Sequence, residues 1–212
     1  MKIGVLGALI GLAAATAAVA AEAPLTLIIE PRVAPIGAQR VSLSGSLLSG
    51  RAGQEIAIEA KECGAPAFVV VRRERTEAGG AWHTEMLPAV KTSYRAVWRN
   101  ARTPAIEVLR RPLVRLEQED ANRFSVLIVA MRFFRGAKGR LERFERATGS
   151  WILVRRVTLS RRSAPRGASW AYTGADFTSN VRRGALVRFV LPRDQAAPCY
   201  LAGHSVQFNV RP

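Results

Sequence analysis

The residues from which most active sites are built are scarce in this chain. Only two histidines, His83 and His204, occur among the 212 residues, and aspartate occurs three times. A zinc site needs three or four His, Cys or carboxylate ligands at short spacings, and neither histidine has another His or a Cys within about four positions. The sequence also lacks the Gly-x-Ser-x-Gly elbow of many hydrolases. We therefore expect no enzymatic activity, no cofactor and no metal.

Long apolar runs are also absent once the first twenty residues have passed. Those residues hold one charge at Lys2, then apolar and small residues, then Ala18-Val19-Ala20. That order predicts a secretory signal peptide over residues 1–21. No later run is long enough to cross a bilayer. We expect a mature chain without a transmembrane segment that is secreted, extracellular or associated with the cell envelope.

Negative charge is scarce relative to positive charge. The sequence has 32 Lys and Arg against 16 Asp and Glu, a net charge of +16, and residues 112–212 alone carry 18 basic and 7 acidic side chains, a net charge of +11. Such a surplus affects adhesion and encounter rates rather than the fold. Export argues against a nucleic-acid partner. The remaining candidates are an anionic polysaccharide, a wall polymer or a membrane surface.

Cysteine occurs twice, as Cys63 and Cys199. An even number of cysteines in an exported chain favours a disulfide, because the compartment is oxidising. Two separate buried or free thiols are the alternative, since the sequence does not reveal whether the two Cα atoms lie within the roughly 4.4–6.8 Å that a bridge requires. The sequence leaves the pairing open, and it leaves the oligomeric state open as well.

Short segments that alternate apolar and polar residues fill the rest of the sequence, separated by Gly, Pro, Ser and Asn. This pattern predicts β-strands. In the first half we expect strands over residues 25–29, 41–47, 55–58, 68–72, 82–87, 92–98 and 106–109. In the second half we expect them over residues 113–116, 124–131, 140–144, 151–159, 170–172, 186–191 and 206–210. About seven strands in some 90 residues are typical of an immunoglobulin-type sandwich. The prediction is an all-β protein of two tandem immunoglobulin-like β-sandwich domains, residues 22–111 and 112–212.

The spacing of the turn and core residues resembles that of exported tandem immunoglobulin-like or fibronectin type III-like repeat proteins of high-GC Gram-positive bacteria. The motifs that carry the resemblance are Gly50-x-x-Gly53, Cys63-Gly64, Gly80-x-Trp82, Pro88, Thr92-x-Tyr94-Arg95-Ala96-x-Trp98 and Arg111-Pro112, then Gly136-x-x-Gly139, Gly149-x-Trp151, Phe189-x-x-Pro192 and Cys199-Tyr200-x-x-Gly203-x-Ser205. The resemblance implies a sandwich fold and an extracellular setting. It implies no catalytic residues.

Basic residues crowd one predicted hairpin of the second half. We predict an anionic-ligand surface made of Arg135, Lys138, Arg140, Arg143, Arg146, Arg155 and Arg156. Alternation would place several of these side chains on the outer face of the sheet, and guanidinium groups fit phosphate and carboxylate oxygens in pairs. The alternative is that the arginines solvate an exposed sheet and guard it against edge-to-edge pairing.

The sequence therefore favours a secreted, non-enzymatic binding or structural module that adheres to anionic envelope polymers through this surface. A small extracellular envelope enzyme or inhibitor, with an active loop at one end of a sandwich, is the alternative function.

Overall fold

The computed structural model describes residues 24–35, 40–164 and 170–212. The predicted signal peptide, residues 1–21, lies outside this part of the chain. Regular structure is nearly all β, and the described helices are a four-residue α1 (Arg193–Ala196) and a 3-10 turn, η1 (Ala78–Gly80). None of the helices in the described ranges is long and apolar enough to cross a bilayer. The prediction of an all-β protein is confirmed.

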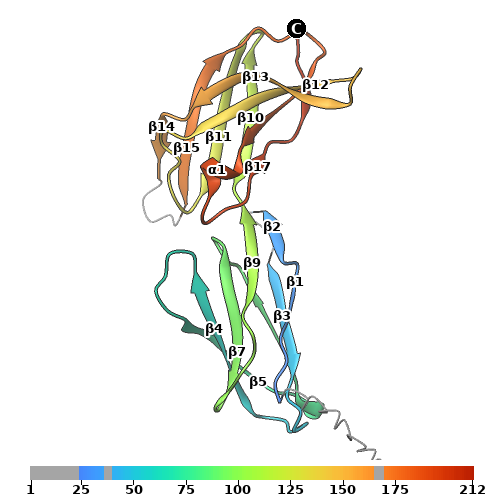
Figure 1. Cartoon of the computed structure of the whole chain (residues 1–212), viewed down its shortest axis with the longest axis vertical. Helices are drawn as coiled ribbons and strands as arrows, with labels where there is room; N and C mark the ends of the chain where they lie inside the picture. Colours follow the sequence, from blue (N-terminus) through green and yellow to red (C-terminus); the bar gives the residue numbers. More distant parts are fainter. Residues whose placement is uncertain (1–23, 36–39, 165–169) are drawn as a thin grey trace, which may run out of the picture.

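The strands form two lobes that follow one another along the long axis (Figure 1). The lower lobe contains a three-stranded sheet in the order β1 (Ile28–Glu30), β3 (Val41–Ser46), β6 (Ala81–Met86). Its other sheet has the order β2 (Val33–Pro35), β9 (Ile106–Arg111), β7 (Thr92–Trp98), β4 (Glu55–Glu62), β5 (Val69–Arg75), with β8 (Ala101–Arg102) also on β7. β2 runs parallel to β9, and the other pairs are antiparallel.

The lower lobe has a core of its own because alternate residues of each strand turn inward. In β7, for example, Tyr94 and Ala96 are buried while their neighbours are partly exposed. Trp82 of β6 packs with them from the opposite sheet.

The upper lobe also contains two sheets. One has the order β10 (Leu113–Asp120), β11 (Arg123–Ala130), β15 (Ala171–Thr178), β14 (Arg161–Ser163). The other has the order β13 (Ser150–Thr158), β12 (Lys138–Glu145), β16 (Leu186–Leu191), β17 (Gly203–His204), with β18 (Phe208–Asn209) also on β16.

Three phenylalanines join the two sheets of the upper lobe at its core. The ring of Phe177 lies 5.8 Å from that of Phe124 and 6.2 Å from that of Phe189, centroid to centroid. Phe189 also needs the absence of a side chain at Gly139, where a Cβ would lie 2.1 Å from its ring. The second core is thus built from residues after Pro112, together with Val90, which packs against it from the lower lobe.

A disulfide crosses between the lobes. Cys63, after β4, is bonded to Cys199, after α1, with a Cα–Cα distance of 5.4 Å and a sequence separation of 136. The backbone of Lys91 lies between the two cysteines: its carbonyl accepts from the Cys63 amide (2.8 Å) and its amide donates to the Cys199 carbonyl (3.0 Å). The bridge therefore holds the segment after α1 against the end of the lower lobe.

Residues 200–202 continue this attachment. The Leu201 amide donates to the Arg110 carbonyl (2.9 Å), and the Arg111 guanidinium donates to the Ala202 carbonyl (2.8 Å). The Tyr200 hydroxyl donates to the Ala89 carbonyl in the lower lobe (3.2 Å) and accepts from the Met131 amide in the upper lobe (2.9 Å). We call residues 199–202 the clamp segment.

Several elements differ from the expected strands. The segment expected at 25–29 pairs regularly only from Ile28, and Leu25 makes a single bridge to Leu47. The strand expected at 170–172 extends to Thr178, and the strand expected at 206–210 is replaced by the short β17 and β18. β2, β8, β14 and α1 were not expected, because elements of two to four residues carry too few positions for a periodic pattern.

Replacing both Cys63 and Cys199 by Ser is expected to lower the free energy of unfolding by roughly 5 kcal/mol, because the bridge closes a loop of more than 100 residues and restricts the unfolded chain. Urea unfolding followed by tryptophan fluorescence measures the difference. Wild-type protein kept in a reducing agent is the matched control and should unfold with the variant. Coincident curves for the variant and the oxidised wild type would contradict the expectation.

Candidate functional site

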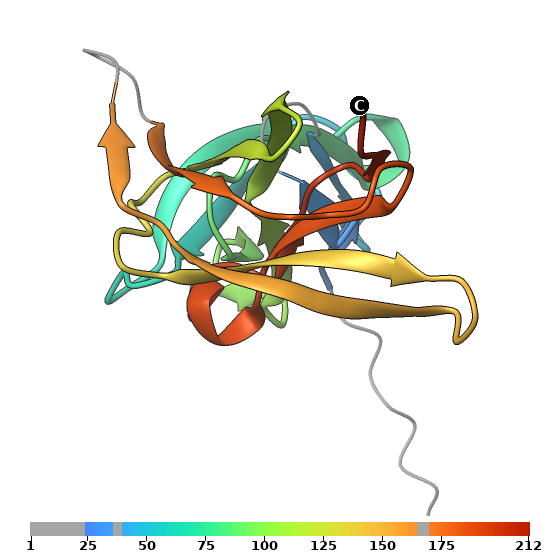
Figure 2. The ribbon, with the colours of Figure 1, turned by 90° about the horizontal axis from the view of Figure 1, so that it is seen from above.

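The long hairpin of β12 and β13 carries most of the predicted anionic-ligand surface, and it extends beyond the other strands of the upper lobe (Figure 2). Arg140 lies directly opposite Arg156 in the register, and Lys138 lies opposite Thr158. Because the side chains of such pairs share a face, Lys138, Arg140 and Arg156 lie together on the outer face of this sheet, and all three are exposed. We call these three residues the basic face.

The other predicted cations do not join the basic face. Arg143 is three residues from Arg140, and Arg155 is next to Arg156, so the two-residue period turns both to the opposite face. The Arg143 guanidinium donates to Glu145 (2.8 Å), and that of Arg155 donates to the Thr178 carbonyl on the other sheet.

Arg135 and Arg146 are exposed near the two ends of the hairpin, outside the strands. Arg135 precedes β12, and Arg146 lies in the turn to β13. The predicted set of seven is therefore divided into a basic face, two flanking arginines and two residues on the opposite face.

Further along the outer face, cationic charge is already neutralised. The guanidinium of Arg188 on β16 donates twice to Glu142 of β12, at 3.0 and 2.9 Å. The same guanidinium lies 4.1 Å from the centroid of Trp151, whose ring is 5.4 Å from Phe144. These aromatic and paired groups bound the basic face on one side.

α1 bounds the basic face on the other side. The Lys138 amide donates to the side-chain carbonyl of Gln195 (2.9 Å). A hydrogen bond from Gln195 and, to a smaller extent, the positive charge of Arg140 lower the pKa of Asp194. The Asp194 carboxylate is therefore close enough to Arg140 to interact with it, and this single negative charge leaves the three cations of the basic face with a net positive charge.

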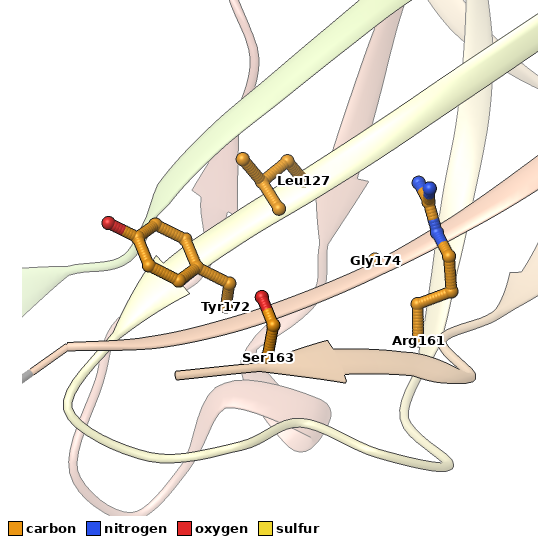
Figure 3. A pocket seen from close by; sticks show the side chains of 5 residues that line it. All are labelled: Leu127, Arg161, Ser163, Tyr172 and Gly174. Carbon is orange, nitrogen blue, oxygen red and sulfur yellow. The ribbon is translucent and has the colours of Figure 1, made fainter. Parts of the chain in front are cut away.

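The second candidate site is a hollow of 360 Å³ on the outer face of the other sheet in the upper lobe (Figure 3). Its lining residues are Leu127 of β11, Tyr172 and Gly174 of β15, and Arg161 and Ser163 of β14. The labelled side chains rise from three neighbouring strands to the same side of the sheet (Figure 3). We call this hollow the Gly174 hollow.

A third pocket, of 280 Å³, lies at the junction of the lobes beside the clamp segment. The titratable groups around it have structural roles. Burial lowers the pKa of Arg110, which is fully buried, and burial raises the pKa of Tyr200, whose hydroxyl is engaged with the backbone of both lobes. The cations that line it include Lys91, which is paired with Glu107 at 3.4 Å. These contacts join the two lobes.

The two histidines stand in different lobes. His83 Nε2 lies 3.1 Å from the Ser42 hydroxyl on β3, and His204 Nδ1 lies near the Ser205 carbonyl. In the described part of the chain, no group of three or more His, Cys, Asp and Glu side chains gathers in a way that could hold a metal ion.

Sequence reasoning missed Tyr172, Ser163 and Gly174 as site residues. The sequence does hold a signal for Gly174, because a glycine inside a strand often marks a position that another group approaches closely. The expected strand stopped at residue 172, so the glycine was not recognised as a strand residue. Tyr200, which connects the lobes, gave no local signal, since its partners are 69 and 111 residues away.

Tyr94, at the end of the lower core, should resist ionisation in the folded protein. Burial, with a smaller contribution from Glu62, raises the pKa of Tyr94 to about 12 from its usual 10. Because the neutral phenol is favoured in the fold, stability is fully present below pH 10 and is lost as the pH rises through 12. In an absorbance titration at 295 nm, Tyr94→Phe should remove a transition near pH 12. A titration above pH 11 that is unchanged by this substitution would contradict the prediction.

Comparison with known proteins gives no family for this chain. No family model matches the sequence, and no curated protein is significantly similar to it. The functional interpretation therefore depends on the geometry and charge of the molecule itself.

Proposed function

We propose that this protein is an exported, non-enzymatic binding module that adheres to anionic polymers of the cell envelope through the basic face. In this proposal, residues 22–111 and 112–212 are two tandem immunoglobulin-like sandwich domains, and residues 1–21 direct export. The support for the domains is that each half has its own pair of sheets and its own core. The support for export is the Cys63–Cys199 disulfide, since disulfides persist in oxidising compartments.

The observation that carries the proposal is the pair of arginines directly opposite each other in the hairpin. Arg140 and Arg156 are cross-strand partners, and like charges in that position destabilise a sheet. Folding therefore gains nothing from the pair. An anionic ligand bound between the two guanidinium groups would relieve the repulsion and would use their fork geometry.

The arrangement of charge suits a polymer better than a single small anion. β12 has eight residues and is therefore about 27 Å long at about 3.4 Å per residue. Arg135 and Arg146 lie beyond its two ends, and the basic face lies in its first half. A chain with repeated negative charges could run along the hairpin and meet these cations in succession.

The proposal assigns no catalysis to the chain. Its histidines stand in separate lobes with serine or backbone partners. The alternative function, an envelope enzyme or inhibitor with an active loop, has no observation in its favour beyond the junction pocket, whose tyrosine and arginine hold the lobes together.

Replacing Arg140 and Arg156 together by Gln should weaken binding to heparin, used here as a model polyanion. The matched control is the double variant Arg182→Gln with Arg183→Gln, which removes two exposed charges from a loop of the same lobe. Both variants have the same net charge. The first should elute from heparin at lower salt than the control, and its slope of log affinity against log salt should be smaller by about two. Equal elution of the two variants would contradict a specific role for the basic face.

A further inference from the structure

We propose that the Gly174 hollow is a binding site for one acidic sugar ring, a uronate whose carboxylate is recognised by Arg161. The site goes beyond the proposed function, because it lies on β11, β15 and β14, whereas the basic face lies on the other sheet.

The register explains how the hollow forms. Leu127, Gly174 and Arg161 are neighbours in one row across three strands, and Tyr172 and Ser163 are partners in the next row. All five residues belong to the outer face, since the inner positions of β11 and β15 pack in the core. Gly174, at the centre of the set, adds no side chain, so the hollow is bordered by the side chains of its neighbours (Figure 3).

The glycine cannot be exchanged without moving the strands. A Cβ at position 174 would lie 2.4 Å from the carbonyl oxygen of Val126 on the adjacent strand. The close approach of the adjacent strand therefore requires a glycine here, and the hollow is present without a ligand. Its 360 Å³ lies within the range of small-ligand pockets.

Arg161 supplies the charged contact. One nitrogen, Nη2, lies 2.8 Å from Asp176 Oδ1 and would be 3.4 Å from a Cβ at Gly174, so the guanidinium lies beside Gly174. The side chain is 53% exposed. A guanidinium has five N–H donors, and the contact with one carboxylate oxygen of Asp176 leaves most of them for a ligand. Its planar fork fits a second carboxylate.

The remaining lining suits a sugar ring. The Ser163 hydroxyl can donate to or accept from ring hydroxyls, and Asp176, which borders the hollow through its ion pair with Arg161, can accept from them. Leu127 and the ring of Tyr172 offer apolar surface to the C–H face of a sugar. In Figure 3 the Tyr172 hydroxyl points away from Arg161, so the ring rather than the hydroxyl borders the hollow.

Charge balance separates a uronate from a phosphate. Among the described residues that line the hollow, Arg161 is the cation, and it is shared with Asp176. A dianionic phosphate would meet the nearby carboxylate at close range, which is unfavourable. A singly charged carboxylate on an otherwise neutral ring meets less repulsion from Asp176.

The test is an NMR titration of the full mature chain with a galacturonic acid trisaccharide, and with the corresponding neutral galactose trisaccharide. Shift changes should centre on Leu127, Ser163, Tyr172 and Gly174, and the acidic sugar should bind at least tenfold more tightly than the neutral one. Arg161→Gln should abolish this preference, and Tyr172→Ala should weaken binding of both sugars. Tyr172→Phe should bind like the wild type.

Arg123→Gln is the matched control. Arg123 lies on the outer face of the same sheet, is 58% exposed and pairs with Glu119 at 3.2 Å, much as Arg161 pairs with Asp176. Its substitution should leave sugar binding unchanged. The proposal is overturned if the acidic sugar causes no shifts around Gly174, if the two sugars bind equally, or if Arg161→Gln and Arg123→Gln have the same effect. Thermal melting of each variant shows that it is folded.

The titration is run in 0.5 M NaCl, where the Debye length falls to about 4 Å and the long-range attraction of the basic face is screened. The Arg140→Gln, Arg156→Gln double variant should bind the trisaccharide like the wild type under these conditions. If the protein is not retained on heparin but still binds the trisaccharide, the proposed function alone is overturned. If it is retained on heparin but does not bind the trisaccharide, the sugar site alone is overturned.

Discussion

The attachment of the clamp segment to the lower lobe is the constraint on which the arrangement of the molecule depends. Two sandwich-like lobes joined through one proline would ordinarily be free to bend. Here the Cys63–Cys199 disulfide, the hydrogen bonds of Lys91 and Leu201 with the other lobe, and the two-sided hydrogen bonding of Tyr200 act at the same place. Each backbone contact is weak by itself, but the covalent bond keeps the partners together and so reduces the entropy that the others must overcome.

The upper lobe presents different chemistry on its two outer faces. Strand alternation gives both sheets an apolar inner face, and the shared core separates the outer faces from one another. One outer face carries opposed arginines, which suit a polymer with repeated charges. The other carries a hollow in which Arg161 shares its charge with Asp176 beside the apolar surface of Leu127 and Tyr172, an arrangement that suits a single ring. Because the clamp segment belongs to the upper lobe and is bonded to the lower lobe, both outer faces have a fixed orientation relative to the lower lobe.

The sequence predicted the all-β character of the fold because a two-residue period is a local signal. β7 follows the predicted segment 92–98 residue for residue. The same period limited the basic set, since neighbours such as Arg155 and Arg156 cannot share a face, and the prediction counted them together. The pairing of Cys63 with Cys199 and the Gly174 hollow depend on contacts between residues far apart in sequence, and no periodic pattern encodes these contacts. The domain boundary at residue 111 and the export of the chain stay predictions.

The most direct measurement of the central constraint is a set of residual dipolar couplings from the backbone amides of the oxidised protein. If the clamp segment holds the lobes as one body, the couplings from the strands of both lobes fit a single alignment tensor when the lobes keep the relative orientation of this structure. Two tensors of different magnitude, one for each lobe, would contradict a fixed junction.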